Sequence, residues 1–254
     1  MTPPLRLSDD NDARADGPLA QSLIALAGTA DDASDIDTRL VVIARLAADT
    51  VPAVTYASVT AYRDNAYTTV AATSDLAIAV DKAQYDEQDG PCLDALDHDK
   101  LVAVPDLAMT MAWPGFRQAA FGMGLRSSLS IPLFAGRGVS IAALNLYSHD
   151  AAAMAALTDR VRAVYSADRV AATDPGTEPS DPGTGELTGG LAAAFAVRRL
   201  IQLAIGAVMV RDGCSADDGY LTLRVEAAET GTCLTDVAVT LLEHRRRSTG
   251  DAGG

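Results

Sequence analysis

Positive charge is scarce in this chain of 254 residues, and lysine is nearly absent. Twenty Lys and Arg residues stand against 34 Asp and Glu residues, which gives a formal net charge of -14. The only lysines are Lys82 and Lys100. Affinity for nucleic acids of any sequence comes mostly from cationic contacts to phosphate, so this charge balance excludes an indiscriminate nucleic-acid binder.

Cysteine and histidine are also few, and their spacing matches no common ligand pattern. The three cysteines, Cys92, Cys214 and Cys233, lie far apart and form no CxxC pair, and the three histidines are scattered. A zinc cage and a disulfide framework are therefore not indicated. We expect reduced thiols, no metal site and no catalytic residues, and the sequence identifies no cofactor.

Long hydrophobic runs are missing as well. No run approaches the ~18 apolar residues of a membrane-spanning helix, and the first 17 residues lack the apolar core of a signal peptide. We therefore expect a cytoplasmic protein without a membrane partner. Hydrophobic residues still make up 48% of the chain, which is enough for real cores. At roughly 150 residues per domain, the length favours two domains.

Polar segments divide the chain. Residues 1–17 are rich in Pro, Asp and Arg, which is typical of a disordered tail. Residues 173–186 combine Pro, Gly, Thr and acids with no large apolar side chain, so we interpret 173–187 as an acidic, mobile linker that buries nothing. The predicted domains are therefore 18–172 and 188–247, with a short tail at 248–254.

The first predicted domain mixes helices and strands. Apolar spacing predicts helices over 19–27, from Asp35 to about 50, from 74 to about 83, over 113–123 and over 151–171. An acidic loop is expected from Gln84, after which Pro91 can begin another helix. Strands are expected over 56–63, 67–73, 101–104, 127–134 and 140–147. Helices that flank mostly antiparallel strands make an α+β domain.

The second predicted domain is all helical. Gly213 and Gly231 can each end a helix, and Ser215, with Asp218 three residues later, can cap the next one. We expect three helices, the first over 187–210. The apolar residues at helical spacing are Leu221, Val225 and Ala228 in the second helix, and Leu234, Val237, Ala238, Leu241 and Leu242 in the third.

Several short motifs follow one another between residues 36 and 148. They are YASVT at 56–60, GPCLDA at 90–95, VPDL at 104–107, WP at 113–114, GLRS at 124–127, SIPL at 130–133 and ALNLY at 143–147. In this order they resemble the GAF family of sensor domains. The resemblance implies a cavity under the sheet that holds a small ligand.

Candidate ligand contacts in that cavity are Tyr56, Tyr85, Cys92, Trp113 and Phe116. The alternative is that the aromatic residues are ordinary core residues. Cys92 stands where a helix N-terminus could lower the pKa of its thiol, which would suit a redox or chromophore-bearing role, or it is simply packed.

Residues of the second domain also occur in a familiar order. They are Gln202, Ala204, Gly206 and Met209, then Tyr220, Leu223 and Arg224, then Leu234, Val237 and Ala238. They resemble the ANTAR domain, the RNA-binding output module of bacterial transcription antiterminators. The resemblance implies a homodimer that binds RNA stem-loops of leader transcripts. The family commonly has lysine where this chain has Ile205, which either removes a phosphate contact or packs beneath the second helix.

The charge of the second domain is compatible with an RNA-contact face. Residues 191–247 hold seven arginines and seven acids, so this part is neutral within an acidic chain. Guanidinium groups bind phosphate, and a tyrosine ring can stack on an unpaired base. Each candidate could individually be an exposed helix residue or a core aromatic. The predicted RNA-binding residues are Arg198, Arg199, Gln202, Arg211, Tyr220 and Arg224.

Together these patterns predict a non-enzymatic regulator. Its GAF domain would sense a small ligand, a redox state or a partner, and its ANTAR domain would bind leader RNA to prevent transcription termination. The alternative is a signalling protein whose degenerate ANTAR domain has lost RNA binding and serves dimerisation.

Overall fold

A five-stranded antiparallel sheet organises the first domain in the computed structural model, which describes residues 16–169 and 181–250. The strand order is β2-β1-β5-β4-β3. The strands are β1 (Tyr56–Arg63), β2 (Ala66–Ala72), β3 (Val102–Val104), β4 (Ser127–Ala135) and β5 (Val139–Ser148). The predicted α+β class is confirmed, whereas most of the predicted N-terminal tail, residues 173–180 of the predicted linker and the last four residues lie outside the described residues.

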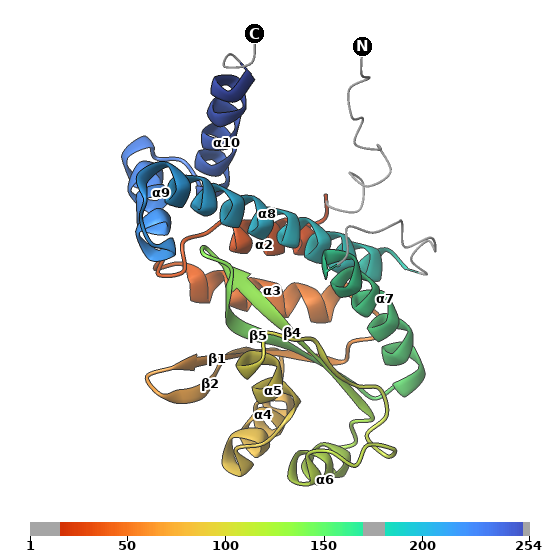
Figure 1. The fold of residues 1–254 in the computed structure, drawn as a ribbon. Helices are drawn as coiled ribbons and strands as arrows, with labels where there is room; N and C mark the ends of the chain where they lie inside the picture. Colours follow the sequence, from red (N-terminus) through yellow and green to blue (C-terminus); the bar gives the residue numbers. More distant parts are fainter. Residues whose placement is uncertain (1–15, 170–180, 251–254) are drawn as a thin grey trace.

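Helices cover both faces of this sheet (Figure 1). Helices α2 (Pro18–Ala27) and α3 (Ile36–Thr50) lie on one face, and α4 (Asp75–Glu87), α5 (Pro91–Asp97) and α6 (Pro114–Gly122) lie on the other. Helix α7 (Ala151–Arg169) follows the last strand. The β1–β2 turn has Asp64 and Asn65 at φ 51° and 63°, the left-handed conformation that short hairpin turns require.

Three helices form the second domain, as the sequence predicts. They are α8 (Pro182–Asp212), α9 (Ala216–Thr230) and α10 (Leu234–Gly250). Gly213 and Gly231 end α8 and α9 in the left-handed conformation, at φ 66° and 67°. Ser215 caps α9, because its hydroxyl oxygen accepts a hydrogen bond of 3.2 Å from the Asp218 amide.

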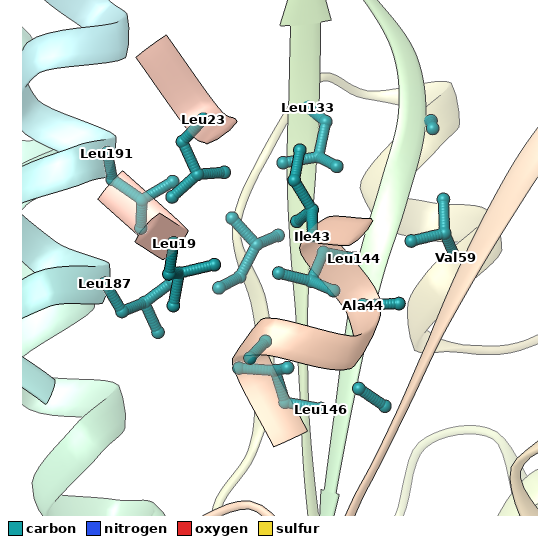
Figure 2. Packing of buried hydrophobic residues seen from close by; sticks show 14 of the residues in the cluster. Leu19, Leu23, Ile43, Ala44, Val59, Leu133, Leu144, Leu146, Leu187 and Leu191 are labelled. Atoms are coloured by element: carbon teal, nitrogen blue, oxygen red, sulfur yellow. The ribbon is translucent and has the colours of Figure 1, made fainter. Parts of the chain in front are cut away.

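Helix α8 contributes to two hydrophobic cores. Its first half packs Leu187, Leu191 and Phe195 into the core that α2 and α3 form against the sheet. Figure 2 shows Leu187 and Leu191 facing Leu19 and Leu23 of α2. Its second half forms a separate core with α9 and α10, through Ile201, Ala204, Ile205 and Val208. The two domains are therefore joined by one continuous helix whose ends belong to different cores.

The prediction of a linker up to residue 187 is wrong for residues 182–187, which are helical. Asp181 caps α8 by accepting a hydrogen bond of 2.7 Å from the Thr184 amide. Gly183 is buried so closely against the Thr50 carbonyl at the end of α3 that any Cβ would overlap with it. Glycine is common in flexible linkers, but here Gly183 allows the backbone of α8 to pack closely against the backbone of α3.

Glu186 fixes the start of α8 to the start of α2. Its carboxylate accepts hydrogen bonds from the backbone amides of Leu19 and Ala20. These amides belong to the first turn of α2, which has no partners for them within the helix. One of the acids that suggested a solvated linker is thus a helix cap supplied from another part of the chain.

Two further expectations differ from the structure. Helix α4 continues to Glu87, so the loop expected from Gln84 begins later, because Gln84 is buried on the same face as Ala77 and Val80. In α9 the buried face is formed by Gly219, Tyr220 and Leu223, whereas the predicted residues Leu221, Val225 and Ala228 are exposed. Gly219 allows α9 to approach the Ile205 carbonyl of α8 closely, and this contact decides which face is buried.

Among the described residues, α8 is the one helix that could cross a membrane by length and composition, with a mean hydropathy of 1.7 over its most apolar window. Arg198 and Arg199 interrupt the apolar sequence of α8, so the helix contains no uninterrupted run of ~18 apolar residues. Its apolar side chains are distributed between the two cores described above. The same composition therefore serves a core helix in this fold.

Candidate functional site

Four of the predicted RNA-binding residues come together on one face of α8 and α9. Arg198 and Gln202 are four residues apart on α8, and Tyr220 and Arg224 are four residues apart on α9, so each pair lies on one side of its helix. We call these four residues the α8–α9 face. It is turned toward the first domain, where two loops meet it: residues 28–35 between α2 and α3, and the β4–β5 turn.

Tyr220 is held by the 28–35 loop. Its hydroxyl donates a hydrogen bond of 2.9 Å to the Asp31 carboxylate and accepts one of 3.2 Å from the Asp31 amide. Only 3% of Tyr220 is exposed. Burial raises the pKa of the phenol to about 12. The residue is therefore a neutral phenol at physiological pH and its ring is covered.

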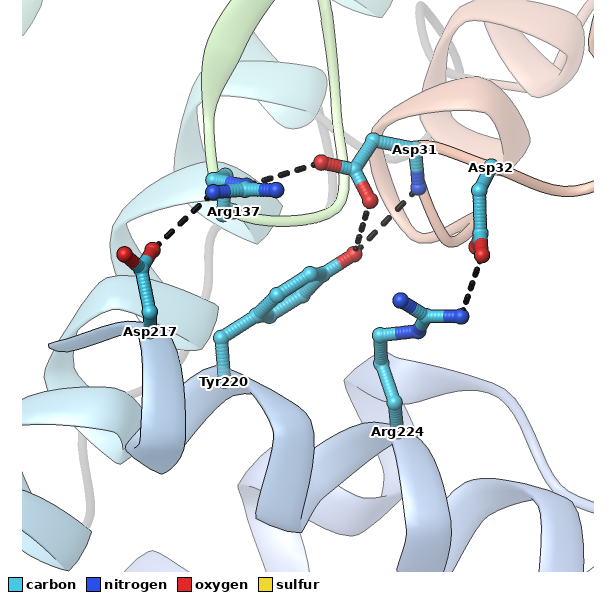
Figure 3. Close-up of polar contacts among 6 residues, drawn as sticks. All are labelled: Asp31, Asp32, Arg137, Asp217, Tyr220 and Arg224. Atoms are coloured by element: carbon cyan, nitrogen blue, oxygen red, sulfur yellow. Dashed lines mark hydrogen bonds and ion pairs between the residues drawn. The ribbon is translucent and has the colours of Figure 1, made fainter.

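Four further charged residues surround this contact (Figure 3). Arg224 forms an ion pair with Asp32. Arg137, from the β4–β5 turn, donates to Asp31 at 2.8 Å and to Asp217 of α9 at 3.0 Å. Both guanidinium groups lie near the Tyr220 ring, with the Arg137 carbon 5.3 Å and the Arg224 carbon 5.8 Å from its centroid.

The α8 half of the face lies against the same turn. The Arg198 guanidinium stacks on Phe134, 3.8 Å from the ring centroid. Gly138 has φ 85°, and a Cβ there would come within 2.9 Å of both Arg198 and Gln202. Glycine at this position therefore allows the turn to approach α8 closely.

The remaining two predicted RNA-binding residues lie elsewhere. Arg211 follows Gln202 by nine residues, about two and a half helical turns, which places it on the opposite side of α8. There it pairs with Asp212 at 2.7 Å and lines a groove of about 370 Å³ together with His244 and Arg245 of α10. Arg199 is exposed on α8. The structure thus brings together four of the six residues.

Ile205 is buried, which decides between its two interpretations. Only 7% of the residue is exposed, and its side chain lies in the core of the second domain beneath Gly219 of α9. A lysine at this position would not face phosphate in this structure. The departure from the family pattern is therefore a packing difference.

A buried polar cluster lies under the sheet of the first domain. At its centre is Asp81 of α4, whose carboxylate accepts hydrogen bonds from Ser58 and Thr69 at 2.9 Å and from Tyr147 at 2.5 Å. Burial raises the pKa of Asp81 to about 6, and the three hydrogen bonds limit that rise. A buried carboxylate with several donors is costly to assemble and marks this cluster as a candidate binding site.

Asn145 of β5 extends the cluster along the sheet. Its amide donates to Thr60 at 2.9 Å and to Ser58 at 3.3 Å. Its carbonyl oxygen is buried without a hydrogen-bond partner among the described residues, and so is the hydroxyl of Ser128. Buried polar atoms without partners are costly, so these groups could accept or donate a hydrogen bond to a bound molecule.

The five predicted ligand contacts divide between this cluster and the apolar core beside it. Tyr85 belongs to the cluster, with its hydroxyl 2.8 Å from Thr60 and 2.9 Å from Thr69. Phe116 is fully buried in the apolar core, and Tyr56 and Trp113 pack against that core. Tyr147 is part of both the core and the cluster.

Of the two interpretations of Cys92, the structure supports a packed thiol and not one with a lowered pKa. It follows Pro91 at the start of α5 and is completely buried. Burial and the negative charge of Asp81 raise the pKa of the thiol well above its usual value. The Cys92 amide donates a hydrogen bond of 3.0 Å to Gln84, so the residue is fixed as a neutral, packed thiol.

Sequence reasoning missed the residues that hold both sites together. Asp81 could have been found, because a carboxylate on the apolar face of a helix, beside Ala77 and Val80, is unusual. Asp31, Asp32 and Arg137 carry no such signal in the sequence. Within residues 16–169 and 181–250, no group of three His, Cys, Asp or Glu side chains is placed to hold a metal ion.

Comparisons with known proteins agree with the two-domain arrangement. Residues 33–164 match the GAF domain family, and residues 190–242 match the ANTAR domain family. No curated protein matches the chain. A solved structure described as "the domain of putative two-component sensor histidine kinase protein from Sinorhizobium meliloti 1021" is 12% identical, with a TM-score of 0.36 over 65% of this chain and 90% of that one. The chain therefore belongs to the GAF domain family and carries an ANTAR domain after it, in the order of GAF–ANTAR regulators.

Proposed function

We propose that this protein is a cytoplasmic, signal-responsive regulator that binds stem-loops of leader transcripts and prevents transcription termination. The observation that carries the proposal is the convergence of Arg198, Gln202, Tyr220 and Arg224 on one face of α8 and α9. A tyrosine ring flanked by guanidinium groups can stack on an unpaired base while the cations bind the neighbouring phosphates.

The first domain supplies the signal in this proposal. The cluster around Asp81 and Asn145 has buried polar groups that a small polar ligand could satisfy. Both residues lie on elements that pack directly on the sheet or form part of it. A ligand that rearranges the cluster would therefore act on the sheet, and α8 is packed against the helices of that sheet.

Crosslinking in cells tests the RNA-binding part. The full-length protein is irradiated in growing cells, and the RNA that copurifies with it is sequenced. We expect stem-loops upstream of coding regions to be enriched, and Arg224→Gln to lose this enrichment. The matched control is Arg45→Gln, which removes an exposed guanidinium from α3. If the parent protein and Arg224→Gln recover the same RNA, the α8–α9 face does not bind it.

A second candidate function is dimerisation without RNA binding. It is favoured by large apolar side chains exposed on α8 and α9, namely Leu203, Val210, Leu221 and Val225. An interface with a second copy of the chain would remove such side chains from water. The two candidates separate in the crosslinking experiment combined with sedimentation: a dimer that enriches no RNA supports the second. A homodimer that enriches stem-loops supports the first.

A further inference from the structure

The α8–α9 face is covered in this structure by acidic residues of the first domain. Asp31 binds the Tyr220 hydroxyl, and Asp32 pairs with Arg224. The β4–β5 turn covers the α8 part of the face, since Gly138 lies against Arg198 and Gln202. A base could not reach the Tyr220 ring in this arrangement.

We infer that the 28–35 loop is an autoinhibitory element, whose two carboxylates occupy the positions that RNA phosphates take when the module is active. The inference rests on the proposed RNA binding and names its regulation. In this structure the protein is closed, and RNA binding requires the loop to leave α9.

The chemistry of the contacts allows a carboxylate to take the place of an RNA phosphate. A carboxylate and a phosphate both present anionic oxygens to a guanidinium group, and both accept a hydrogen bond from a phenol. Asp31 and Asp32 are consecutive, so one loop supplies anions to Tyr220 and Arg224 at the same time. Arg137 adds a cation from the turn, which joins Asp31 to Asp217 of α9.

The location of these contacts makes the loop the part that can move. Helix α8 cannot leave the first domain easily, because Leu187, Leu191 and Phe195 are buried in its core. The polar contacts of α9 with the first domain differ in depth: the Asp32 side chain is 59% exposed and that of Asp217 is 83% exposed, whereas the Asp31 side chain is 12% exposed and Tyr220 is buried. Exposed ion pairs contribute little to stability and weaken with salt, so they suit a reversible closure.

The 28–35 loop has further contacts beside its two carboxylates. It contains no helix or strand, and its partly buried Ala30 packs against the core of the second domain while Ala33 packs against that of the first. Gly28 lies beside Thr235 of α10, where a Cβ would come within 2.7 Å of the threonine hydroxyl. Asp31 and Asp32 supply the polar contacts of the loop with Tyr220 and Arg224, so removing both carboxylates should weaken its hold on α9 while every residue of the two hydrophobic cores stays unchanged.

The experiment compares the full-length parent with Asp31→Asn/Asp32→Asn. The matched control is Asp37→Asn/Asp86→Asn, which removes the same charge from residues outside the loop that pair with Arg63 and Lys82 of the first domain. The probe is a fluorescein-labelled pool of tandem stem-loop RNAs with randomised loops, enriched on the double variant. Hydrogen exchange of the peptide covering 28–35 reports the position of the loop independently of RNA.

We expect the double variant to bind the enriched RNA about tenfold more tightly than the parent and the control, a typical size for coupling between sites. We also expect saturating RNA to speed exchange of the 28–35 peptide in the parent, because RNA displaces the loop. If circular dichroism shows that the double variant does not fold, Arg137→Gln takes its place in the enrichment and the titration, because it releases the loop from the other side. Either variant should bind the RNA more tightly than the parent and exchange its 28–35 peptide faster without RNA.

Other outcomes overturn the inference in distinguishable ways. Equal affinities of parent and double variant for the RNA would refute autoinhibition and leave the proposed function in place. Unchanged exchange of the 28–35 peptide in the variants would mean that the carboxylates do not hold the loop. If the loop opens but the double variant enriches no RNA, the proposed function fails, and the inference fails with it.

Discussion

The shared helix α8 predicts that the two domains unfold together, and Leu191→Ala tests this directly. Leu191 is 2% exposed and packs in the core that contains Leu19 and Leu23 of α2. Truncating a buried leucine to alanine costs about 2 to 5 kcal/mol, through lost burial and the cavity that remains. For a chain of this size each kcal/mol lowers Tm by about 2 to 4 °C, so we expect a loss of at least about 4 °C.

Two probes report the two domains separately in one thermal experiment. The single tryptophan, Trp113, lies in the first domain, so its fluorescence follows that domain alone. Hydrogen exchange of α9 and α10, measured as the temperature rises, follows the second. Because α8 continues from the first core into the second, we expect both transitions to shift together to the same lower temperature.

The control is Leu203→Ala on the same helix. Leu203 is 64% exposed, so the same truncation should change stability by no more than about 0.5 kcal/mol. If Leu191→Ala lowers the Trp113 transition while α9 and α10 melt at their original temperature, the two cores are independent. The conclusion that α8 couples them would then be wrong.

Three further predictions follow from the buried residues. Ile205→Lys should lower the free energy of unfolding by at least about 2 kcal/mol, because it buries an ammonium group; a thermal melt that matches the parent would mean that the lysine reaches solvent. Leu234→Ala should cost about 2 to 5 kcal/mol in urea denaturation, whereas Val239→Ala on the exposed side of α10 should cost less than about 1 kcal/mol; equal losses would refute the register of α10. The pKa of Asp81 rises from 3.8 to about 6 on folding, so the native state binds the proton more tightly and Asp81 lowers stability as pH rises from about 4 to 6. Asp81→Asn should remove this contribution, so a stability difference between pH 4 and pH 7 that equals the parent's would contradict it.

Local signals in the sequence determined most of the secondary structure. Gly213 and Gly231 end their helices because glycine adopts the left-handed conformation without a steric penalty. Asp64 and Asn65 make the β1–β2 turn for a related reason, since both residue types tolerate that conformation. Such preferences act within a few residues, so they can be read before the fold is known.

The sequence also indicated which residues share a helix face in the second domain, but only in part. Arg198 and Gln202 are four residues apart in the chain, and so are Tyr220 and Arg224, a spacing at which two residues of a helix share a face. This spacing could not show which side of α9 faces inward, because the apolar pattern of Leu221 and Val225 is as regular as that of the buried face. The approach of α9 to α8 at Gly219 decided this, and it depends on the geometry of both helices.

Composition was misleading where small residues pack closely. The segment 182–187 has the composition of a linker, yet Gly183 packs against α3 and Glu186 caps α2. Glycine makes the chain flexible where no other segment lies near it, and it permits close packing where another backbone does. Only the tertiary structure shows which of the two applies.

The two domain families, the antiparallel sheet and the three C-terminal helices could be predicted from the sequence, because the motifs and turn residues that indicate them lie close together in the chain. The tertiary structure decided that Asp31 covers Tyr220, a contact between residues 189 positions apart. It also decided that Asp81 lies buried among Ser58, Thr69 and Tyr147. Neither contact leaves a periodic trace in the sequence, because a hydrogen bond between distant segments depends on how whole elements pack and not on the spacing of residues within one of them.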